Sequence, residues 1–460
     1  MLADGSLGLW HILTGDLLCR FVSFNKNQDW LVVTPEGMFD GSPAARQYVS
    51  WRIGSGLNVV PVDRFFQDFY RPGLAAEIWR GERPMPEVQI AKTLPPRIKI
   101  ASPKAGEMDS QTVTIAVEAV DQGGGVSRVA IYQNGARVLA EGENRREGQT
   151  LFRSFKMSLV EGKNHFRVTA ASGDGSWEAE PAEIVLSYER PLAKSQLHLV
   201  AIGVSRYADA NLNLEYAAKD AQGMTDLFQR RGKGLYDKVN VTTVTDDQAT
   251  RDGIKSALKN AVAETRPQDT LVLFLAGHGA MVGQRYFFVP HDLRRKTEQL
   301  EDDLRTQGLP ADELSDYLGA AKALKRVLIL DTCSSGGALQ AAVKGRSGFA
   351  LRGAIERLSR TQGLFTIAAA SATEEAKESK ELGHGVLSYA LLAGMKGVNR
   401  GPLEATSVQP SGPDRVVDIM EWFTFAAGQV PRLTEKLYGA AQDVQTSTQG
   451  NSFPVLPLDE

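Results

Sequence analysis

The chain has 460 residues, of which 42% are hydrophobic and 23% are charged, and its formal net charge is −3. This composition is typical of soluble globular proteins, and the length suggests about three domains of roughly 150 residues each. The nearly balanced charge gives no electrostatic reason to expect nucleic acid or an anionic membrane as a partner, and no apolar run approaches the roughly 18 residues of a membrane span. With Cys19 and Cys333 as the only cysteines, the sequence favours a reducing, cytoplasmic compartment without a structural disulfide.

The first 60 residues read as short strands and turns. Residues 4–10 and the turn at Thr14-Gly15 resemble the end of a WD-repeat blade. A propeller needs at least about four blades, so we expect either the remnant of a truncated propeller or a segment that docks onto the rest of the chain. Residues 61–94 predict a linker that is first helical and rich in aromatic residues and then rich in proline, with the aromatic side chains interpreted as core.

Residues 95–190 predict an all-β domain. Alternating strands recur at short spacing, and Asn134-Gly135 is a strong hairpin signal. The pattern predicts an immunoglobulin-like sandwich, similar to modules that bacterial multidomain proteins use as spacers or binding domains. We expect this sandwich and the preceding β segment to bind a regulatory protein partner, and we expect His165 on a strand face without a catalytic role.

From about residue 195 to the C-terminus, strands alternate with helices. We predict strands near residues 197–204, 239–245, 271–276, 326–331 and 364–370. We predict helices near residues 215–231, 250–265, 310–323 and 385–396. Alternation on this scale implies an α/β domain in which helices cover both faces of a mostly parallel sheet.

Two of these predicted strands lead into reactive side chains, His278 and Cys333. The carboxyl ends of parallel strands meet at one edge of a sheet, and a neighbouring imidazole can convert a thiol to a thiolate. Taken singly, each residue is more often a packing residue of the core. Taken together they predict a cysteine-histidine dyad, with the backbone N–H groups of Gly279 and Cys333 as an oxyanion hole.

The region from Leu197 onward resembles the caspase and metacaspase-like cysteine peptidases, in particular the bacterial orthocaspases. The resemblance rests on five motifs: Lys219-Asp220-Ala221, Ala276-Gly-His278-Gly279, Asp331-Thr-Cys333-Ser-Ser-Gly336, Phe365-Thr-Ile-Ala-Ala-Ala-Ser371 and Gly383-His384-Gly385-Val-Leu-Ser-Tyr-Ala. The histidine precedes the cysteine by a spacing close to the roughly 50 residues of caspases. The resemblance implies that His278 is the general base and that Cys333 is the nucleophile.

The resemblance also implies specificity for a basic residue before the scissile bond. Metacaspase-like enzymes bind the basic side chain with an aspartate two places before the cysteine, here Asp331, and with one on the first helix, which matches Asp220. The physics agrees, because a buried carboxylate pair is costly unless a cation arrives. The alternative is that Asp220 lies on a solvated helix face and that Asp331 caps the helix after its strand. Ser371 matches a region that lines the peptide groove in the family.

The segment from Lys344 to Arg360 lies where activation cleavage tends to occur in caspase-like enzymes. Its basic residues are Lys344, Arg346, Arg352, Arg357 and Arg360. We predict self-cleavage after one of them, since the inferred pocket would accept them. The alternative is a solvated, charged loop and helix.

Metacaspases are often calcium-dependent, and Glu301-Asp302-Asp303 could supply oxygen ligands. The alternative is a solvated charge cluster, so we expect no required cofactor and retain calcium as a candidate. His384, which lies between glycines before a predicted helix, is interpreted as structural.

The sequence therefore predicts a monomeric cysteine endopeptidase that acts on protein substrates. The alternative is a catalytically silent, caspase-like scaffold that acts through protein–protein interaction. A serine acyl hydrolase is disfavoured because the chain has no G-x-S-x-G motif.

Overall fold

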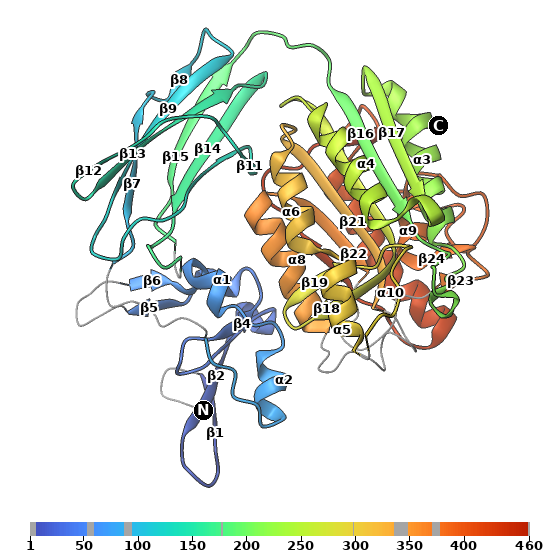
Figure 1. The fold of residues 1–460 in the computed structure, drawn as a ribbon, viewed down its shortest axis with the longest axis horizontal. Coiled ribbons are helices and arrows are strands. Elements are labelled where there is room, and N and C mark those ends of the chain that lie inside the picture. The colour runs from blue at the N-terminus through green and yellow to red at the C-terminus, as the bar shows by residue number, and fades with distance from the viewer. Residues whose placement is uncertain are drawn as a thin grey trace. The chain divides into compact units, whose positions relative to one another are not determined.

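The computed structural model describes residues 6–52, 59–86, 94–175, 178–297, 299–334, 348–369 and 378–458. For Asn27, Arg52, Gln67, Cys333, Ser334 and residues 348–350 it describes the backbone only. The chain forms two compact units. The first comprises residues 1–132 and 140–188, and the second comprises residues 133–139 and 189–460. Figure 1 labels most helices and strands of each unit. Within the described residues, no helix is long and apolar enough to span a membrane.

The first unit begins with a four-stranded antiparallel meander. Its strands pair in chain order and are β1 (Leu7–Trp10), β2 (Leu17–Phe24), β3 (Asp29–Val33) and β4 (Phe39–Gly41). They are followed by the antiparallel pair β5 (Ser50–Arg52) and β6 (Val59–Pro61), and by the helices η3 (Val62–Phe65), α1 (Phe66–Phe69) and α2 (Leu74–Trp79). This single four-stranded sheet is not evidence for the WD-repeat propeller that residues 4–15 suggested.

The aromatic residues of the helical segment form part of the core of this region. Phe65 and Phe69 are fully buried, and the Phe66 ring stacks on Tyr70 with 4.3 Å between centroids. Trp79 differs, because 80% of it is exposed. The interpretation of these aromatics as core is therefore confirmed for the first four and is wrong for Trp79.

Residues 97–188 form the predicted β-domain. One sheet has the order β12 (Asn144–Glu147), β13 (Thr150–Ser158), β9 (Thr112–Val120), β7 (Arg97–Ser102). The other sheet has the order β11 (Ala136–Val138), β10 (Val129–Gln133), β14 (Gly162–Ala170), β15 (Ala182–Tyr188), β8 (Gly106–Glu107). Asn134 and Gly135 both have positive φ, at 51° and 90°, which is the conformation that a type I′ hairpin turn requires.

The second unit is built on a mostly parallel sheet. Its main strands have the order β17 (Lys238–Thr245), β16 (Gln196–Gly203), β18 (Thr270–Val282), β21 (Lys325–Ser334), β22 (Phe365–Ala369), β26 (Val444–Ser447). All neighbours in this order are parallel except β26, which is antiparallel to β22. The short strands β19 (Arg285–Phe288) and β20 (Leu309–Pro310) extend from β18. All five strands predicted from the sequence are confirmed.

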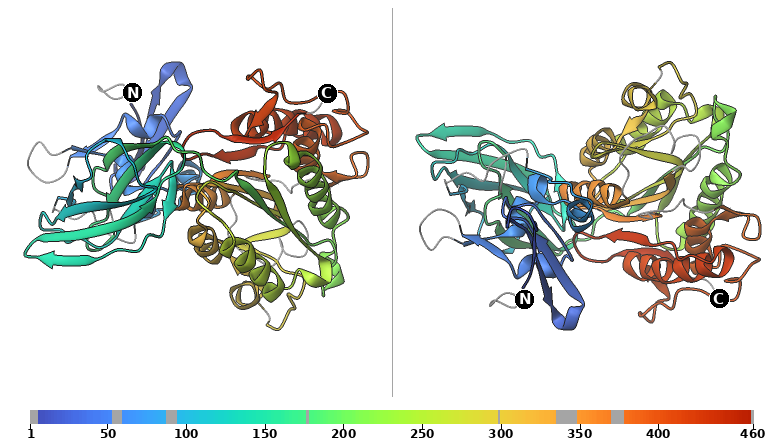
Figure 2. Two further views of the ribbon diagram at one scale, coloured as in Figure 1. Left: turned by 90° about the horizontal axis from the view of Figure 1, so that it is seen from above. Right: turned by 90° about the horizontal axis from the view of Figure 1, so that it is seen from below.

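Helices cover both faces of this sheet, as Figures 1 and 2 show. One face packs against α3 (Ala217–Arg231), α9 (Val386–Gly394) and α10 (Ile419–Tyr438), and the other packs against α4 (Arg251–Ala263), α5 (Leu300–Gln307), α6 (Ala311–Ala320) and α8 (Gly348–Gln362). In strand β18, apolar and polar residues do not alternate, because both faces of the strand are buried. Val272 and Phe274 point into the first core while Leu271 and Leu273 point into the second, and all four are buried.

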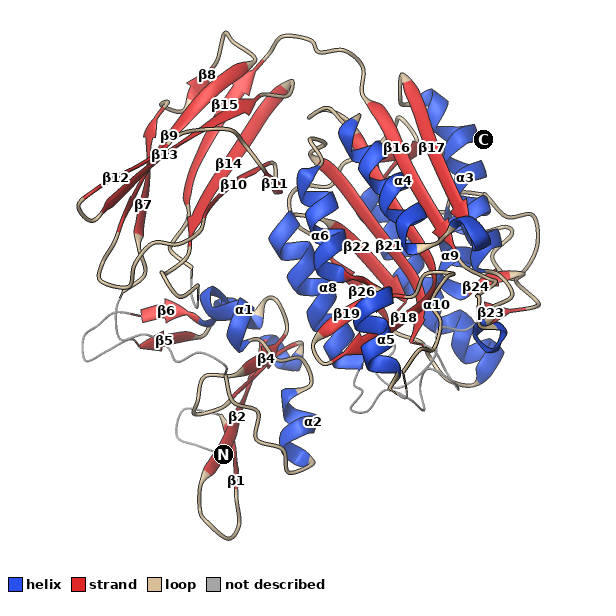
Figure 3. Cartoon of the chain, in the orientation of Figure 1, coloured by secondary structure: helices blue, strands red, loops and turns tan. Residues whose placement is uncertain are grey.

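Several elements were not predicted. Helix α10 begins at a capping box formed by Asp418 and Glu421, and it ends at Gly439 in the left-handed conformation. Figure 3 shows α5 among the helices of this unit, together with the small strand pair β23 (Glu378–Ser379) and β24 (His384–Gly385). A second small pair is formed by β25 (Val416–Asp418) and β27 (Pro454–Pro457).

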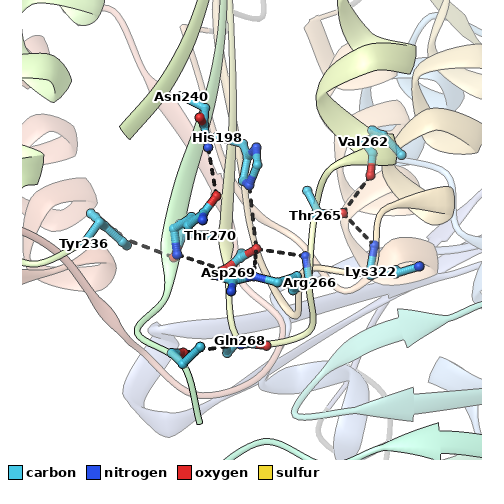
Figure 4. Close-up of polar contacts among 12 residues, drawn as sticks. His198, Tyr236, Asn240, Val262, Thr265, Arg266, Gln268, Asp269, Thr270 and Lys322 are labelled. Atoms are coloured by element: carbon cyan, nitrogen blue, oxygen red, sulfur yellow. Dashed lines mark hydrogen bonds and ion pairs between the residues drawn. The ribbon is translucent and has the colours of Figure 1, made fainter. Parts of the chain in front are cut away.

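A buried polar cluster ties together the amino ends of β16 and β18 (Figure 4). Asp269 is fully buried, and its carboxylate accepts hydrogen bonds from the backbone N–H of Gln196 at 2.8 Å and from Nε and Nη2 of Arg266 at 3.0 and 2.9 Å. His198 Nε2 lies 3.6 Å from the same carboxylate. Burial alone would raise the pKa of Asp269, but the nearby His198 ring and the hydrogen bonds from Arg266 and Gln196 outweigh it and hold this pKa well below its usual range.

Replacing Asp269 with Asn is expected to lower the free energy of unfolding by about 2 kcal/mol at neutral pH, because the amide loses the charge-assisted bonds of Arg266. Since the folded-state pKa lies below the unfolded value of about 3.8, the carboxylate stabilises the protein above that value and stops doing so as the pH falls toward the folded-state pKa. The difference between wild type and variant should therefore shrink below about pH 4. Thermal unfolding followed by helical circular dichroism measures it.

The control is Glu264→Gln, a change at the exposed residue that ends α4, which should shift stability by less than about 0.5 kcal/mol. A difference for Asp269→Asn that is absent at neutral pH, or that grows on acidification, would contradict this account of the cluster.

Candidate active site

His278 and Cys333 are direct neighbours on adjacent parallel strands. β18 and β21 pair in a register that places His278 opposite Cys333 and Gly279 opposite Ser334. Neighbouring strands lie about 4.8 Å apart, so the backbones of these two residues are adjacent. The register therefore brings together the two residues that the sequence placed at the ends of separate strands. The side chain of Cys333 itself lies outside what the structure describes.

The imidazole of His278 is held in one tautomer. Nε2 lies 2.7 Å from the backbone carbonyl oxygen of Leu212, which can only accept a hydrogen bond, so Nε2 carries the proton. Nδ1 is then an acceptor, and it is buried without a hydrogen-bond partner among the described residues. A buried nitrogen with a free lone pair is an unusual feature that calls for a functional explanation.

The charge state of His278 follows from its burial. Only 6% of the residue is exposed, and burial lowers the pKa of His278 to about 4, while the hydrogen bond to Leu212 opposes this shift in part. The ring is therefore neutral at pH 7 and can accept a proton at Nδ1. A neutral imidazole with an available lone pair is suited to general-base catalysis.

Tyr207, which sequence reasoning missed, fixes the backbone at this histidine. Its hydroxyl oxygen accepts the His278 backbone N–H at 2.8 Å, and its ring lies 5.1 Å from the imidazole. Gly277 has φ +148°, and a Cβ there would lie 3.0 Å from the Tyr207 hydroxyl, whereas a Cβ at Gly279 would lie 2.6 Å from the Tyr286 ring. The two tyrosines therefore leave no room for a side chain at either flanking position.

Asp220 and Asp331 form a pair of buried carboxylates. Asp220 lies in the first turn of α3, Asp331 lies on β21, and their exposed fractions are 2% and 7%. Both approach Gly385, where a Cβ would lie 2.6 Å from Asp331 Oδ2 and 3.1 Å from Asp220 Oδ2. Neither carboxylate forms an ion pair with a Lys or Arg among the described residues.

Burial opposes the ionisation of both carboxyl groups, and the charge of Asp331 adds to this effect at Asp220. Burial and then the negative charge of Asp331 raise the pKa of Asp220 well above its usual value, against the backbone N–H of Gly385 and the charge of Lys219. Burial also raises the pKa of Asp331, against the hydrogen bonds that Ser388 donates. A site of this kind favours the arrival of a cation.

The alternatives for these two residues have different outcomes. The solvated helix face suggested for Asp220 is wrong, because this residue is buried. Asp331 does accept a backbone N–H in the first turn of a helix, that of Ser388 at 3.0 Å, but the helix is α9 and not the one after its own strand. His384, interpreted as structural, donates from Nδ1 to Asp220 Oδ1 at 2.6 Å and so belongs to this carboxylate site.

Of the other predicted site residues, Gly279 lies on β18 beside Ser334, and Ser371 lies outside the described residues. In the acidic run 301–303, the Asp303 carboxylate accepts backbone N–H groups of Lys296 and Thr297 at 3.0 and 3.2 Å. No cluster of three or more His, Cys, Asp or Glu side chains with the arrangement of a metal site occurs in the described part of the chain.

The predicted self-cleavage residues fall into two groups. Arg352, Arg357 and Arg360 lie on α8, whose helical backbone is unlike the extended conformation in which grooves usually receive a peptide. Lys344 and Arg346 lie outside the described residues. The five positions are therefore not equivalent, and the three on the helix are disfavoured.

Comparisons with known proteins identify one family for the α/β sheet of the second unit and one for the β-domain of the first unit. The family model of the caspase domain matches residues 197–442, and that of the bacterial Ig domain matches residues 96–148. No curated protein matches the chain.

Similar solved structures include a protein from Geobacter sulfurreducens, with 16% identity and a TM-score of 0.37, over 56% of this chain and 94% of that chain. They also include titin M4, with 14% identity and a TM-score of 0.16 over 21% and 97%, and CopC from Methylosinus trichosporium OB3b, with 16% identity and a TM-score of 0.16 over 22% and 99%. Because the caspase-domain model matches more than half of the chain, this protein belongs to the caspase-domain family, peptidase family C14.

Proposed function

We propose that the protein is a cysteine endopeptidase that cleaves protein substrates after Arg or Lys. The observation that carries the proposal is the buried Nδ1 of His278, which has no partner among the described residues and lies on the strand position paired with Cys333. A base held in one tautomer beside a cysteine has the arrangement that nucleophilic catalysis requires.

In the proposed reaction, Nδ1 of His278 removes the thiol proton of Cys333, and the sulfur attacks the scissile carbonyl carbon. The tetrahedral oxyanion is stabilised by the backbone N–H groups of Gly279 and Cys333. The protonated His278 then gives its proton to the leaving amine as the C–N bond breaks. Water, deprotonated by the same ring, hydrolyses the thioester and restores the free thiol.

The basic specificity is supported by the two buried carboxylates. Both hydrogen bonds of Ser388 fall on Oδ2 of Asp331, so Oδ1 has no partner among the described residues. This oxygen and the charge of Asp220 would receive the guanidinium or ammonium group of the substrate. An Asp side chain would instead be repelled.

Hydrolysis of matched fluorogenic peptides that end in Arg, Lys or Asp tests the proposal, with and without calcium. Wild type should cleave the Arg and Lys peptides, and Cys333→Ala should cleave none. Cleavage after Asp would overturn the pocket assignment. No cleavage of any peptide under either condition would favour the scaffold alternative.

The KM for an Arg peptide is expected to fall as the pH rises. Below the raised pKa values of Asp220 and Asp331 the pocket is neutral, and only above them does it carry the charge that attracts a cation. Titrating KM from about pH 5 to about pH 9 measures this, with a citrulline peptide, a neutral isostere of Arg, as the control. A KM for the Arg peptide that follows the citrulline peptide at every pH would contradict the charged pocket.

We also propose that the enzyme is activated by self-cleavage after Lys344 or Arg346. Intact mass of wild type, of Cys333→Ala and of the double variant Lys344→Gln/Arg346→Gln tests this. We expect fragments from wild type alone. An intact wild type that is fully active on peptides would remove the idea.

A further inference from the structure

His384 is the side chain that contacts Asp220 most closely. It lies on the two-residue strand β24, directly before α9. Its Nδ1 is 2.6 Å from Oδ1 of Asp220, and the backbone N–H of Gly385 donates to Oδ2 at 3.0 Å. Each oxygen of this carboxylate is thus held by one donor, which fixes the orientation of its plane.

The same short segment also holds the second carboxylate. The backbone N–H of Ser388 donates to Asp331 Oδ2 at 3.0 Å, and its hydroxyl donates to the same oxygen at 2.5 Å. The segment from His384 to Ser388 therefore supplies four donors to the two carboxylates. Gly385 lies between them, and its missing side chain lets both approach.

The charge of His384 distinguishes it from an ordinary ion-pair partner. Burial first, and then the positive charges of Lys219 and Arg400, lower the pKa of His384 to about 4. The carboxyl groups of Asp331 and Glu378 also act on the pKa of Asp220, and Glu378 is paired in register with Gly385. A neutral ring donates a hydrogen bond to Asp220, whereas a Lys or Arg in its place would also cancel the negative charge.

We propose that His384 is a positioning residue for the basic pocket: its ring orients the Asp220 carboxylate that recognises the Arg or Lys of the substrate. This role rests on the proposed peptidase function, because it deepens the specificity of the same site. The residue acts through Asp220 and does not touch the reacting atoms.

The test compares His384→Ala with His384→Asn, since the Asn amide places an N–H donor near the position of Nδ1. The first readout is the Kd of a fluorescent peptide ending in Arg, and of its citrulline counterpart, measured in the Cys333→Ala background so that no cleavage occurs. The second is kcat and KM for the Arg peptide with Cys333 present. His291→Ala is the matched control, because Nδ1 of His291 is also hydrogen-bonded to an oxygen, but to the backbone carbonyl of Arg206 and not to a carboxylate of the pocket.

For His384→Ala we expect Kd and KM for the Arg peptide to rise about tenfold, because an oriented hydrogen bond to a charged group is lost. We expect kcat to change less than about twofold, the citrulline affinity to stay constant, and His384→Asn to recover most of the Arg affinity. The thermal unfolding midpoint reports whether each variant is folded.

The outcomes separate this role from the proposed function. Arg-peptide affinity that is unchanged in His384→Ala would overturn the positioning role while leaving the peptidase proposal intact. Equal losses for Arg and citrulline peptides, without recovery in His384→Asn, would show a merely structural residue. If the wild type cleaves no peptide but binds the Arg peptide in a way that depends on His384, the positioning role would be supported and the peptidase proposal would be overturned. No Arg binding at all would overturn both.

Discussion

Replacement of His278 by alanine is expected to lower kcat/KM for an Arg-ended peptide by about 10³- to 10⁴-fold. The loss should fall on kcat, because the imidazole removes and returns protons and does not bind the basic side chain. This large loss of activity is expected because the Leu212 carbonyl holds the imidazole proton on Nε2. Nδ1, which has no partner among the described residues, can then accept the thiol proton. Steady-state kinetics with one Arg peptide measures both constants.

The control for this experiment is His165→Ala, a change on strand β14 of the first unit. It should leave both constants within about twofold. A decrease of less than about tenfold for His278→Ala would mean that another group serves as the base, and the assignment of His278 would be wrong.

Replacement of Asp331 by Asn is expected to lower kcat/KM for Arg peptides by about 10²- to 10³-fold, and to change the citrulline peptide much less. Asn keeps the shape and an oxygen that can accept the Ser388 hydrogen bonds, so the main loss is the charge. Removing this charge also removes one cause of the raised pKa of Asp220, so the pH at which KM changes should move downward.

Asp226→Asn is the matched control, because Asp226 lies on the exposed side of α3 and not in the pocket. It should leave the preference for Arg over citrulline intact. An Asp331→Asn enzyme with an unchanged preference would show that the basic side chain is recognised elsewhere.

The central sheet could be predicted because its strands carry a strong signal. Uninterrupted apolar runs such as 271–276 and 327–330 have no solvated face, and that pattern is typical of strands buried on both sides. The position of His278 and Cys333 followed from the rule that parallel strands end at the same edge. The alternative of a charged loop and helix for residues 344–360 anticipated α8, whereas α10 was missed although Asp418, Glu421 and Gly439 mark both of its ends.

The partners of the site residues could not be predicted in the same way. Leu212 contributes a backbone carbonyl, and no residue type signals which carbonyl will face a ring. Tyr207 acts through a hydroxyl that meets a backbone N–H from a strand far along the chain. His384 meets Asp220 only because β24 and the start of α9 fold over α3, a long-range contact that local sequence does not encode.

The most direct test of the central claim is covalent labelling with peptidyl electrophiles that end in Arg or in Asp, followed by mass mapping of the modified cysteine. Cys19 is an internal control, since it is buried and its pKa is raised to about 11, so little of it is a thiolate at neutral pH. The account predicts that the Arg probe modifies Cys333 and not Cys19, that the Asp probe modifies neither, and that His278→Ala slows the labelling. Labelling of Cys333 by the Asp probe, or no labelling of Cys333 by the Arg probe, would contradict it.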